Sequence, residues 1–137
     1  MTKIILDTNV IVSALIKSDT PPALILSSYV PFCELCLSEI IFSEYETVLA
    51  RPKFRSFPTF YDRAKQVLTL LQQIGTFYTP DQKINYITDE ADNRFLELAI
   101  IAQADYLITG NTNDFNFTVF ENTKIVTPSE FINSFSL

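Results

Sequence analysis

Histidine is absent from this sequence of 137 residues. Its imidazole is the side chain that most often acts as a general base near neutral pH. The absence excludes Ser-His-Asp and Cys-His catalysis, zinc hydrolysis with histidine ligands, and histidine acid–base catalysis without a metal. Any acid–base or metal chemistry must therefore depend mainly on carboxylates, and the chain has 16 acidic residues against 10 basic ones.

The chain also has few glycines and no long hydrophobic run. Two glycines, with 47% hydrophobic and 19% charged residues, are typical of a globular protein. No apolar run approaches the roughly 20 residues that span a bilayer, and the first one ends at Asp7, too early for a signal peptide. We therefore expect one cytoplasmic domain, residues 1–137, without membrane contact. The net charge of −6 argues against a general DNA-coating protein.

Only two cysteines are present, Cys33 and Cys36, in a C-x-x-C pattern that invites a redox or zinc interpretation. They lie in the apolar segment 32–37, which is predicted to be a strand, so the two sulfurs would point to opposite faces. Redox pairs of this type normally lie at a helix N-terminus, and zinc would need further ligands. We expect both thiols to be buried and unreactive.

Hydrophobic periodicity and capping signals predict strands that alternate with helices. The expected strands are residues 3–6, 32–37, 106–109 and 124–126, with a short extended piece at 76–79. The expected helices are residues 10–16, 21–29, 38–49, 60–74, 92–103 and 128–135. This alternation is typical of an α/β domain whose parallel sheet is covered on both faces.

Polar residues follow two of the expected strands. Asp7 comes directly after the first strand, and the polar loop 110–116 follows the strand at 106–109. Ligands of open parallel sheets bind outside the carboxyl ends of the strands, where these residues would meet. An aspartate at such a position can equally be a helix N-cap, so its position alone leaves both roles open for Asp7.

Glu44 lies on the predicted apolar stripe of its helix, four residues after Ile40 and four before Val48. A carboxylate on a core-facing stripe is costly unless it is paired or coordinates a metal. A salt bridge to an arginine is the alternative explanation.

Asp92 shows a similar anomaly at the start of a later helix. It precedes Phe95 by three residues and is in phase with Ala99. Asp89 and Glu90 stand beside it, and capping or a favourable place near the helix dipole is the alternative for any of the three. We select Asp92 because it is the acid in phase with the apolar stripe.

Together these positions predict a carboxylate cluster. Converging carboxylates repel one another and raise one another's pKa. A divalent cation relieves this repulsion, and oxygen ligands suit Mg²⁺ or Mn²⁺. The matching chemistry is metal-assisted phosphodiester hydrolysis, in which the metal activates water and offsets charge on the phosphate.

With these residues in place, the chain closely resembles the PIN-domain family, especially its branch of prokaryotic toxin–antitoxin toxins. The matching segments are residues 5–10, 38–49, 51–54, 89–93, 95–99 and 104–111. Each segment is weak as a pattern, but their order and spacing are fairly specific. The resemblance implies a three-layer α/β/α sandwich with a central parallel sheet. It also implies a metal-dependent endoribonuclease that cleaves single-stranded RNA to a 5′-phosphate and a 3′-hydroxyl.

The resemblance further implies roles for individual residues. Asp7, Glu44 and Asp92 match the three acidic ligand positions for Mg²⁺ or Mn²⁺. Thr8 or Asn9 would support the first acid, and Thr109 would contribute a hydroxyl behind the ligands.

A fourth acid of the family is ambiguous in this sequence. Many relatives have aspartate directly after the Thr-Gly pair, where this chain has Asn111, and Asp114 follows three residues later. Either could complete the site as a metal ligand, with Asp114 as the catalytic acid. The resemblance also implies a homodimer and a cognate antitoxin partner.

Arg51, Lys53 and Arg55 form the densest basic group in the chain. They could contact RNA phosphates, with neighbouring phenylalanines as stacking surfaces for bases. The candidate stacking residues are Phe54, Phe57 and Phe60. An ordinary solvated helix end explains the basic group equally well.

Two other classes of protein compete with this interpretation. A haloacid-dehalogenase-type phosphatase needs a second aspartate where this chain has Asn9, and a phospho-receiver domain needs an acidic pair just after its first strand. A catalytically degenerate PIN domain that binds RNA or protein without cutting is the stronger alternative, chiefly because of Asn111.

Overall fold

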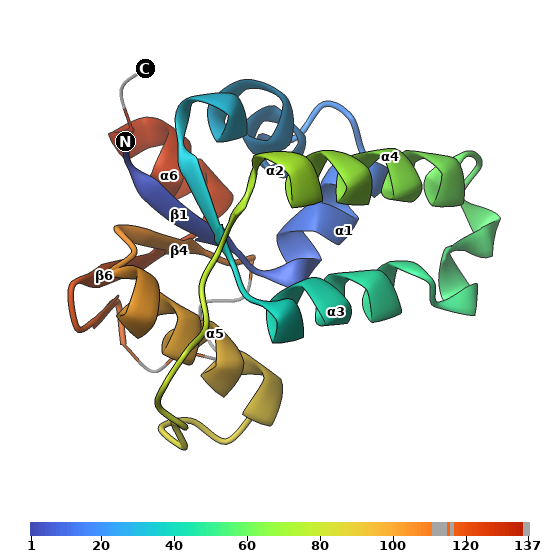
Figure 1. The fold of residues 1–137 in the computed structure, drawn as a ribbon. Coiled ribbons are helices and arrows are strands. Elements are labelled where there is room, and N and C mark those ends of the chain that lie inside the picture. Colours follow the sequence, from blue (N-terminus) through green and yellow to red (C-terminus); the bar gives the residue numbers. More distant parts are fainter. Residues whose placement is uncertain (111–114, 116, 136–137) are drawn as a thin grey trace.

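The computed structural model describes residues 1–110, 115 and 117–135. Its centre is a six-stranded sheet with the order β3-β2-β1-β4-β6-β5 (Figure 1). The strands are β1 (Lys3–Leu6), β2 (Glu34–Leu37), β3 (Thr76–Phe77), β4 (Tyr106–Ile108), β5 (Val119–Phe120) and β6 (Thr123–Val126). All neighbours pair in parallel except β5 and β6, which are antiparallel. The predicted parallel sheet is confirmed, with one antiparallel edge strand added.

Helices cover both faces of this sheet. The α-helices are α1 (Thr8–Ile16), α2 (Pro21–Leu24), α3 (Glu39–Leu49), α4 (Phe60–Ile74), α5 (Glu90–Ala102) and α6 (Pro128–Ser134). Shorter turns are the π-helix η1 (Ile25–Tyr29) and the 3₁₀ helices η2 (Val30–Phe32) and η3 (Pro52–Ser56). Helix α5 contacts β1 and β2 on one face, and α6 contacts β6 and α2 on the other (Figure 1). The expected three-layer α/β/α arrangement is therefore confirmed.

The strands at the centre are apolar because both of their faces are covered. Ile4, Ile5 and Leu6 of β1 have no exposed surface, and neither have Leu107 and Ile108 of β4. Continuous apolar runs of this kind are typical of parallel strands between two helical layers.

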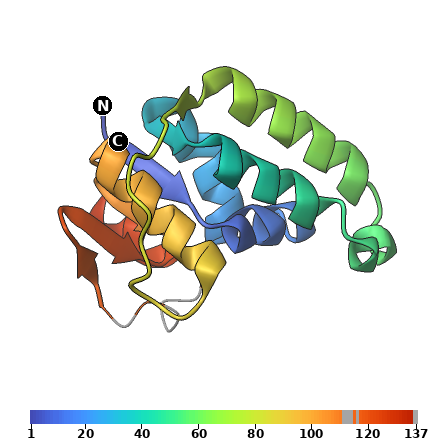
Figure 2. The ribbon, with the colours of Figure 1, turned by 60° about the horizontal axis from the view of Figure 1, so that its bottom comes forward.

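Helices α3 and α4 form a hairpin that extends beyond the sheet (Figure 2). Phe54 and Phe60 stack at its tip with ring centroids 4.5 Å apart. At its other end, Gly75 lets α4 approach β2 closely. A Cβ added there would lie 2.4 Å from Leu37 Cδ1 and 2.7 Å from the Leu71 carbonyl oxygen. The aromatic stack therefore closes the tip of the hairpin, and Gly75 fixes where α4 rejoins the sheet.

The two cysteines lie in and next to β2. Cys33 precedes the strand and Cys36 lies within it, so the prediction of one strand from residue 32 was too long. The two thiols are buried and free, as expected. Burial raises the pKa of both, to about 12 for Cys36.

Among the described residues, no single helix is both long and apolar enough to cross a membrane. Helix α1 and the segment Pro21–Phe32 pass that test only as a pair, by length and composition, and they are bent by 101° relative to each other.

Candidate active site

Asp7 stands at the carboxyl end of β1, the position that the sequence predicts for a functional acid. Its backbone N–H donates to the Ile108 carbonyl oxygen at 2.9 Å, which extends the pairing of β1 with β4 by one residue. Only 7% of the Asp7 surface is exposed. The two central strands therefore fix this carboxylate at the edge of the sheet.

The side chain of Asp7 does not cap the helix that follows it. Asp7 occupies the N-cap position of α1 but makes no side-chain capping hydrogen bond. Its Oδ2 atom accepts a hydrogen bond from the Thr109 hydroxyl at 2.7 Å. Thr109 directly follows β4, and its N–H donates to the Val126 carbonyl oxygen at 2.9 Å. A hydroxyl from the neighbouring strand thus orients the carboxylate, which weakens the alternative that Asp7 is merely a cap.

Burial raises the pKa of Asp7 above its ordinary value, and the negative charge of Glu44 raises it further. The Thr109 hydroxyl and the backbone N–H groups of Asn9 and Thr8 oppose this shift. The desolvation outweighs these favourable contacts. Asp7 is therefore a carboxylate whose charge the folded protein itself does not fully compensate.

Glu44 reaches the same edge of the sheet from α3. Its Oε2 atom accepts a hydrogen bond from the Thr8 hydroxyl, so the side chain of the residue after Asp7 supports Glu44. Among the described residues, no arginine forms an ion pair with Glu44, so the salt-bridge alternative finds no support. Asn9 is exposed, and its backbone N–H faces Asp7. The structure thus brings two carboxylates together, one from the N-cap position of α1 and one from the second turn of α3.

The predicted position of Glu44 on its helix was partly wrong. Ile40, expected on the buried stripe, is 61% exposed, and Glu44 is half-buried. The core-facing residues of α3 are Ile41, Phe42, Tyr45, Val48 and Leu49. The buried face is centred about one residue further along than predicted, because Phe42 and Tyr45 fill the core instead of Ile40. Glu44 therefore lies at the margin of that face, where its carboxylate can meet Thr8.

Tyr45 lies buried close to this pair, and sequence reasoning missed it. The residue is fully buried, and its hydroxyl donates to the Leu6 carbonyl oxygen at 2.5 Å. Burial raises its pKa well above the ordinary value, and the charges of Asp7 and Glu44 raise it further. Tyr45 is therefore a neutral phenol buried beside the two carboxylates. A tyrosine directly after a candidate acid was the only signal available.

Asp92 lies in the first turn of α5 with 8% of its surface exposed. The helix begins at Glu90, two residues earlier than predicted. Asp89 is its N-cap and accepts from the N–H groups of Ala91 and Asp92, at 2.8 and 3.3 Å. Asp89 thus takes the capping role, which leaves the buried Asp92 as the candidate acid of this helix.

A second set of polar contacts fixes the segment before α5, residues 79–88, which we call the strap. Asn93 Oδ1 accepts from the N–H groups of Tyr86 and Ile87, each at 3.0 Å, and its Nδ2 donates to the Ile87 carbonyl at 2.8 Å. Asn93 is only 2% exposed. The residue beside Asp92 therefore ties the strap to the first turn of α5.

An ion pair one turn later anchors the same strap. Glu97 Oε2 contacts Arg94 Nη2 at 3.0 Å and accepts from the Ile84 N–H at 2.7 Å. Arg94 in turn donates to the Ile84 carbonyl at 3.0 Å. Sequence reasoning missed this group, although Glu97 meets the criterion that selected Glu44: a carboxylate within an apolar helical run.

The arrangement of donors fits a hard divalent cation only in part. Asp7 and Glu44 are neighbouring carboxylates, and their shared negative charge would favour a bound cation. However, no group of three or more Asp, Glu, Cys or His side chains in the described part of the chain could hold a metal ion. Asp92 therefore does not join the other two in such a group. Asn111 and Asp114, the other expected ligands, lie outside the described residues.

The basic group Arg51, Lys53 and Arg55 lies exposed at η3, the tip of the α3–α4 hairpin. Phe54 and Phe60 are 5% and 1% exposed, so the expectation that they offer stacking surfaces to bases is wrong. They stack on each other to close the hairpin instead.

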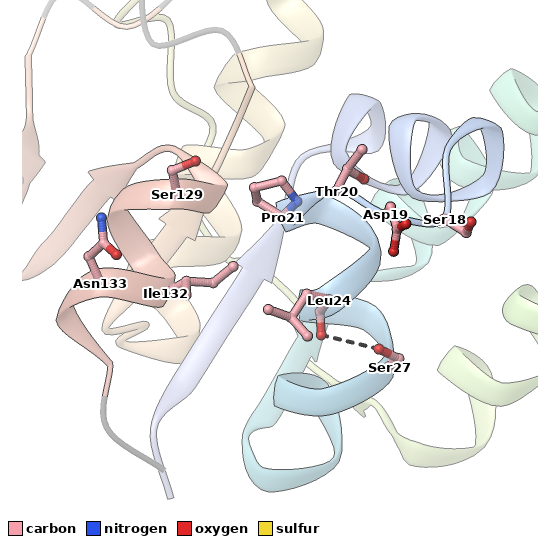
Figure 3. Close-up of a pocket in the computed structure, with 9 residues that line it drawn as sticks. All are labelled: Ser18, Asp19, Thr20, Pro21, Leu24, Ser27, Ser129, Ile132 and Asn133. Carbon is pink, nitrogen blue, oxygen red and sulfur yellow. Dashed lines mark hydrogen bonds between the residues drawn. The ribbon is translucent and has the colours of Figure 1, made fainter.

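A surface hollow of about 490 Å³ lies away from these residues, between α2 and α6 (Figure 3). Its walls are mainly hydroxyl and aliphatic side chains, with Asp19 as its carboxylate. It contains none of the candidate acids. The chemistry of the carboxylate pair is therefore not placed in this cavity.

Comparison with known proteins agrees with this fold. Residues 3–113 match the sequence profile of the PIN domain. The chain is 31% identical to the uncharacterized protein MJ1680 of Methanocaldococcus jannaschii, over 97% of this chain and 91% of that protein. The fold is similar to a chain in the crystal structure of VapBC2 from Rickettsia felis bound to a DNA fragment from their promoter. That match has a TM-score of 0.63 and 16% identity, and it covers 92% of this chain and 98% of the other. The chain belongs to the PIN-domain family.

Proposed function

We propose that this PIN domain is a metal-dependent endoribonuclease that hydrolyses single-stranded RNA as the toxin of a toxin–antitoxin pair. The observation that carries the proposal is the Asp7–Glu44 carboxylate pair at the carboxyl edge of the sheet. Each acid is oriented by a threonine hydroxyl, from Thr109 and Thr8. Membership of a family of nucleases supports hydrolysis as the class of reaction.

The residues of the chain would prepare the site before substrate arrives. The Thr109 hydroxyl holds Asp7 and the Thr8 hydroxyl holds Glu44, so neither carboxylate needs to reorganise. When bound, Mg²⁺ or Mn²⁺ supplies positive charge that lowers the pKa of the attacking water and offsets charge on the phosphate. Asp92 is proposed as the third acid, and Asn111 or Asp114, which follow β4 in the sequence, would complete the set.

The partners of this enzyme are part of the proposal. Likeness to a chain of VapBC2, a structure that contains promoter DNA, supports a cognate antitoxin for this chain. We further propose a homodimer, on family resemblance. The exposed basic group at η3, made of Arg51, Lys53 and Arg55, would contact the phosphates of single-stranded RNA.

A panel of single-stranded RNAs with Mn²⁺, Mg²⁺ or EDTA tests the activity. The wild type is compared with an Asp7→Asn/Glu44→Gln variant and with an Asp19→Asn/Glu46→Gln control. The control likewise removes one aspartate and one glutamate charge, but from exposed positions, and Glu46 lies on the same helix as Glu44. We expect metal-dependent cleavage by the wild type and the control, and none by the Asp7/Glu44 variant. Equal cleavage by all three proteins would contradict the assignment.

A degenerate PIN domain that binds RNA or protein without cleavage is the second candidate. The observation that favours it is the lack of a three-ligand metal group among the described residues. Calorimetry with Mn²⁺ separates the two functions, since a binding module has no need of a tight metal site. RNA binding without Mn²⁺ binding or cleavage would establish this second function.

A further inference from the structure

Tyr86 is the most exposed aromatic side chain in the described part of the chain, at 65%. It belongs to the strap and packs against the rings of Phe117 and Phe120, each with centroids 5.3 Å apart. The interplanar angles are 64° and 59°, so these neighbours support Tyr86 without stacking on its face. Its ring is therefore held from the side while much of its surface faces solvent.

The location of this ring links it to the candidate active site. The backbone N–H of Tyr86 donates to Asn93, the residue that follows Asp92 in the first turn of α5. On its other side, the Thr118 carbonyl, next to Phe117, accepts from the Ile125 N–H of β6 at 2.8 Å. The following residue of β6, Val126, is bonded to Thr109, which in turn orients Asp7. The aromatic group therefore lies between the first turn of α5, which carries Asp92, and the antiparallel pair of β5 and β6.

We propose that Tyr86, supported by Phe117 and Phe120, stacks against a base of single-stranded RNA bound in the active site. This inference rests on the proposed function and names a binding residue for its substrate. Bases of single strands stack readily on exposed aromatic rings, and this contact tolerates any sequence. Asn93 holds the strap in place beforehand, so the strap would lose little conformational freedom when the base binds.

The surroundings of Tyr86 favour a base over a protein partner. Along the strap, Lys83, Asn85 and Thr88 are exposed and polar, so Tyr86 is not part of a continuous apolar run. Protein interfaces usually need a broader apolar centre, whereas an exposed ring that two phenylalanines support and that polar side chains border along the strap suits one base and its sugar–phosphate.

Fluorescence offers a direct test because the chain contains no tryptophan. Tyr86→Trp creates a single probe at the proposed site, and Phe32→Trp creates a control with similar exposure, since Phe32 is 63% exposed. Phe32 precedes β2, so it lies at the opposite edge of the parallel sheet from Asp7. Both probes are placed in the Asp7→Asn background with Mn²⁺, so that the RNA stays intact.

Single-stranded RNA should quench the indole fluorescence of the Tyr86→Trp protein saturably and leave the Phe32→Trp control unchanged. Duplex RNA of the same sequence, whose bases are already stacked, should quench much less. In the active enzyme, Tyr86→Ala should raise the KM for single-stranded RNA about tenfold with a smaller change in kcat. Tyr86→Phe keeps the aromatic ring and should have the KM of the wild type. Thermal melting confirms that each variant is folded.

The outcomes separate this inference from the proposed function. RNA cleavage by the wild type without quenching at position 86 would overturn the stacking site alone. Quenching without cleavage by the wild type would support the stacking site while contradicting the nuclease. If neither occurs, both proposals fail. Loss of self-association in Tyr86→Ala, with RNA affinity unchanged, would overturn the inference and identify a protein interface.

Discussion

Substituting Asn93 by alanine should loosen the strap before α5 and weaken the site beside it. The change removes three hydrogen bonds of 2.8 to 3.0 Å from a side chain that is 2% exposed. Each such bond contributes about 0.5–1.5 kcal/mol. Tyr86 is exposed and Ile87 half-buried, so water can replace part of what is lost. We therefore expect the free energy of unfolding to fall by about 2–3 kcal/mol.

Urea denaturation of the metal-free proteins measures this loss. Asn133→Ala is the matched control, because Asn133 lies exposed on α6. Its stability should stay within about 0.5 kcal/mol of the wild type. In Asn93→Ala, the amide protons of Tyr86 and Ile87 should also exchange faster with solvent, since their acceptor is gone.

The same variant tests whether the strap supports the proposed function. Loss of Asn93 should lower Mn²⁺ affinity about tenfold or more, as outer contacts of metal sites commonly do. A loss of stability below about 0.5 kcal/mol, with unchanged exchange at both amides, would refute the hydrogen-bond reasoning. A large loss of stability with unchanged Mn²⁺ affinity would show that the strap is structural only.

Three further predictions concern charge and thiol chemistry. Burial raises the pKa of Asp7, so the native state retains a proton that the unfolded state has lost above pH 3.8. Stability of the metal-free protein should therefore fall as pH rises from there through the raised pKa, and Asp7→Asn should remove that fall in a series of thermal melts. Cys33 and Cys36 should react with a thiol reagent at pH 8 only after denaturation, because burial raises both pKa values; rapid reaction of the native protein would contradict this. Replacing the three basic side chains at η3 by serine should weaken single-stranded RNA binding and reduce the slope of log affinity against log salt by about 2. An unchanged slope would show that they contact no phosphate.

The elements with strong local patterns were predictable from sequence. The helix at residues 60–74 matches α4 residue for residue, because amphipathic periodicity and Gly75 mark it locally. Strand β5 was missed, since Val119–Phe120 is only two residues long and becomes a strand through its antiparallel pairing with β6. Two residues are too few for a local sequence pattern to predict such a pairing.

The candidate site was predictable where topology alone fixes a residue. Asp7 follows β1, and the parallel order of the sheet places it beside Thr109. Glu44 depended on helix phase, and the exposure of Ile40 shifted that phase by about one residue. Glu97 shows why the argument from buried charge needs a structure. It satisfies the same sequence criterion as Glu44, yet Arg94 and the strap compensate its charge.

Calorimetric titration with Mn²⁺ tests the central claim most directly, because it needs no knowledge of the RNA target. The wild type is compared with Asp7→Asn and with Asp19→Asn, which removes an exposed carboxylate from the hollow between α2 and α6. We predict that the wild type and Asp19→Asn bind Mn²⁺ equally and that Asp7→Asn binds about tenfold or more weakly. Wild-type Mn²⁺ affinity in Asp7→Asn, or no Mn²⁺ binding by the wild type, would contradict a metal-dependent active site at Asp7.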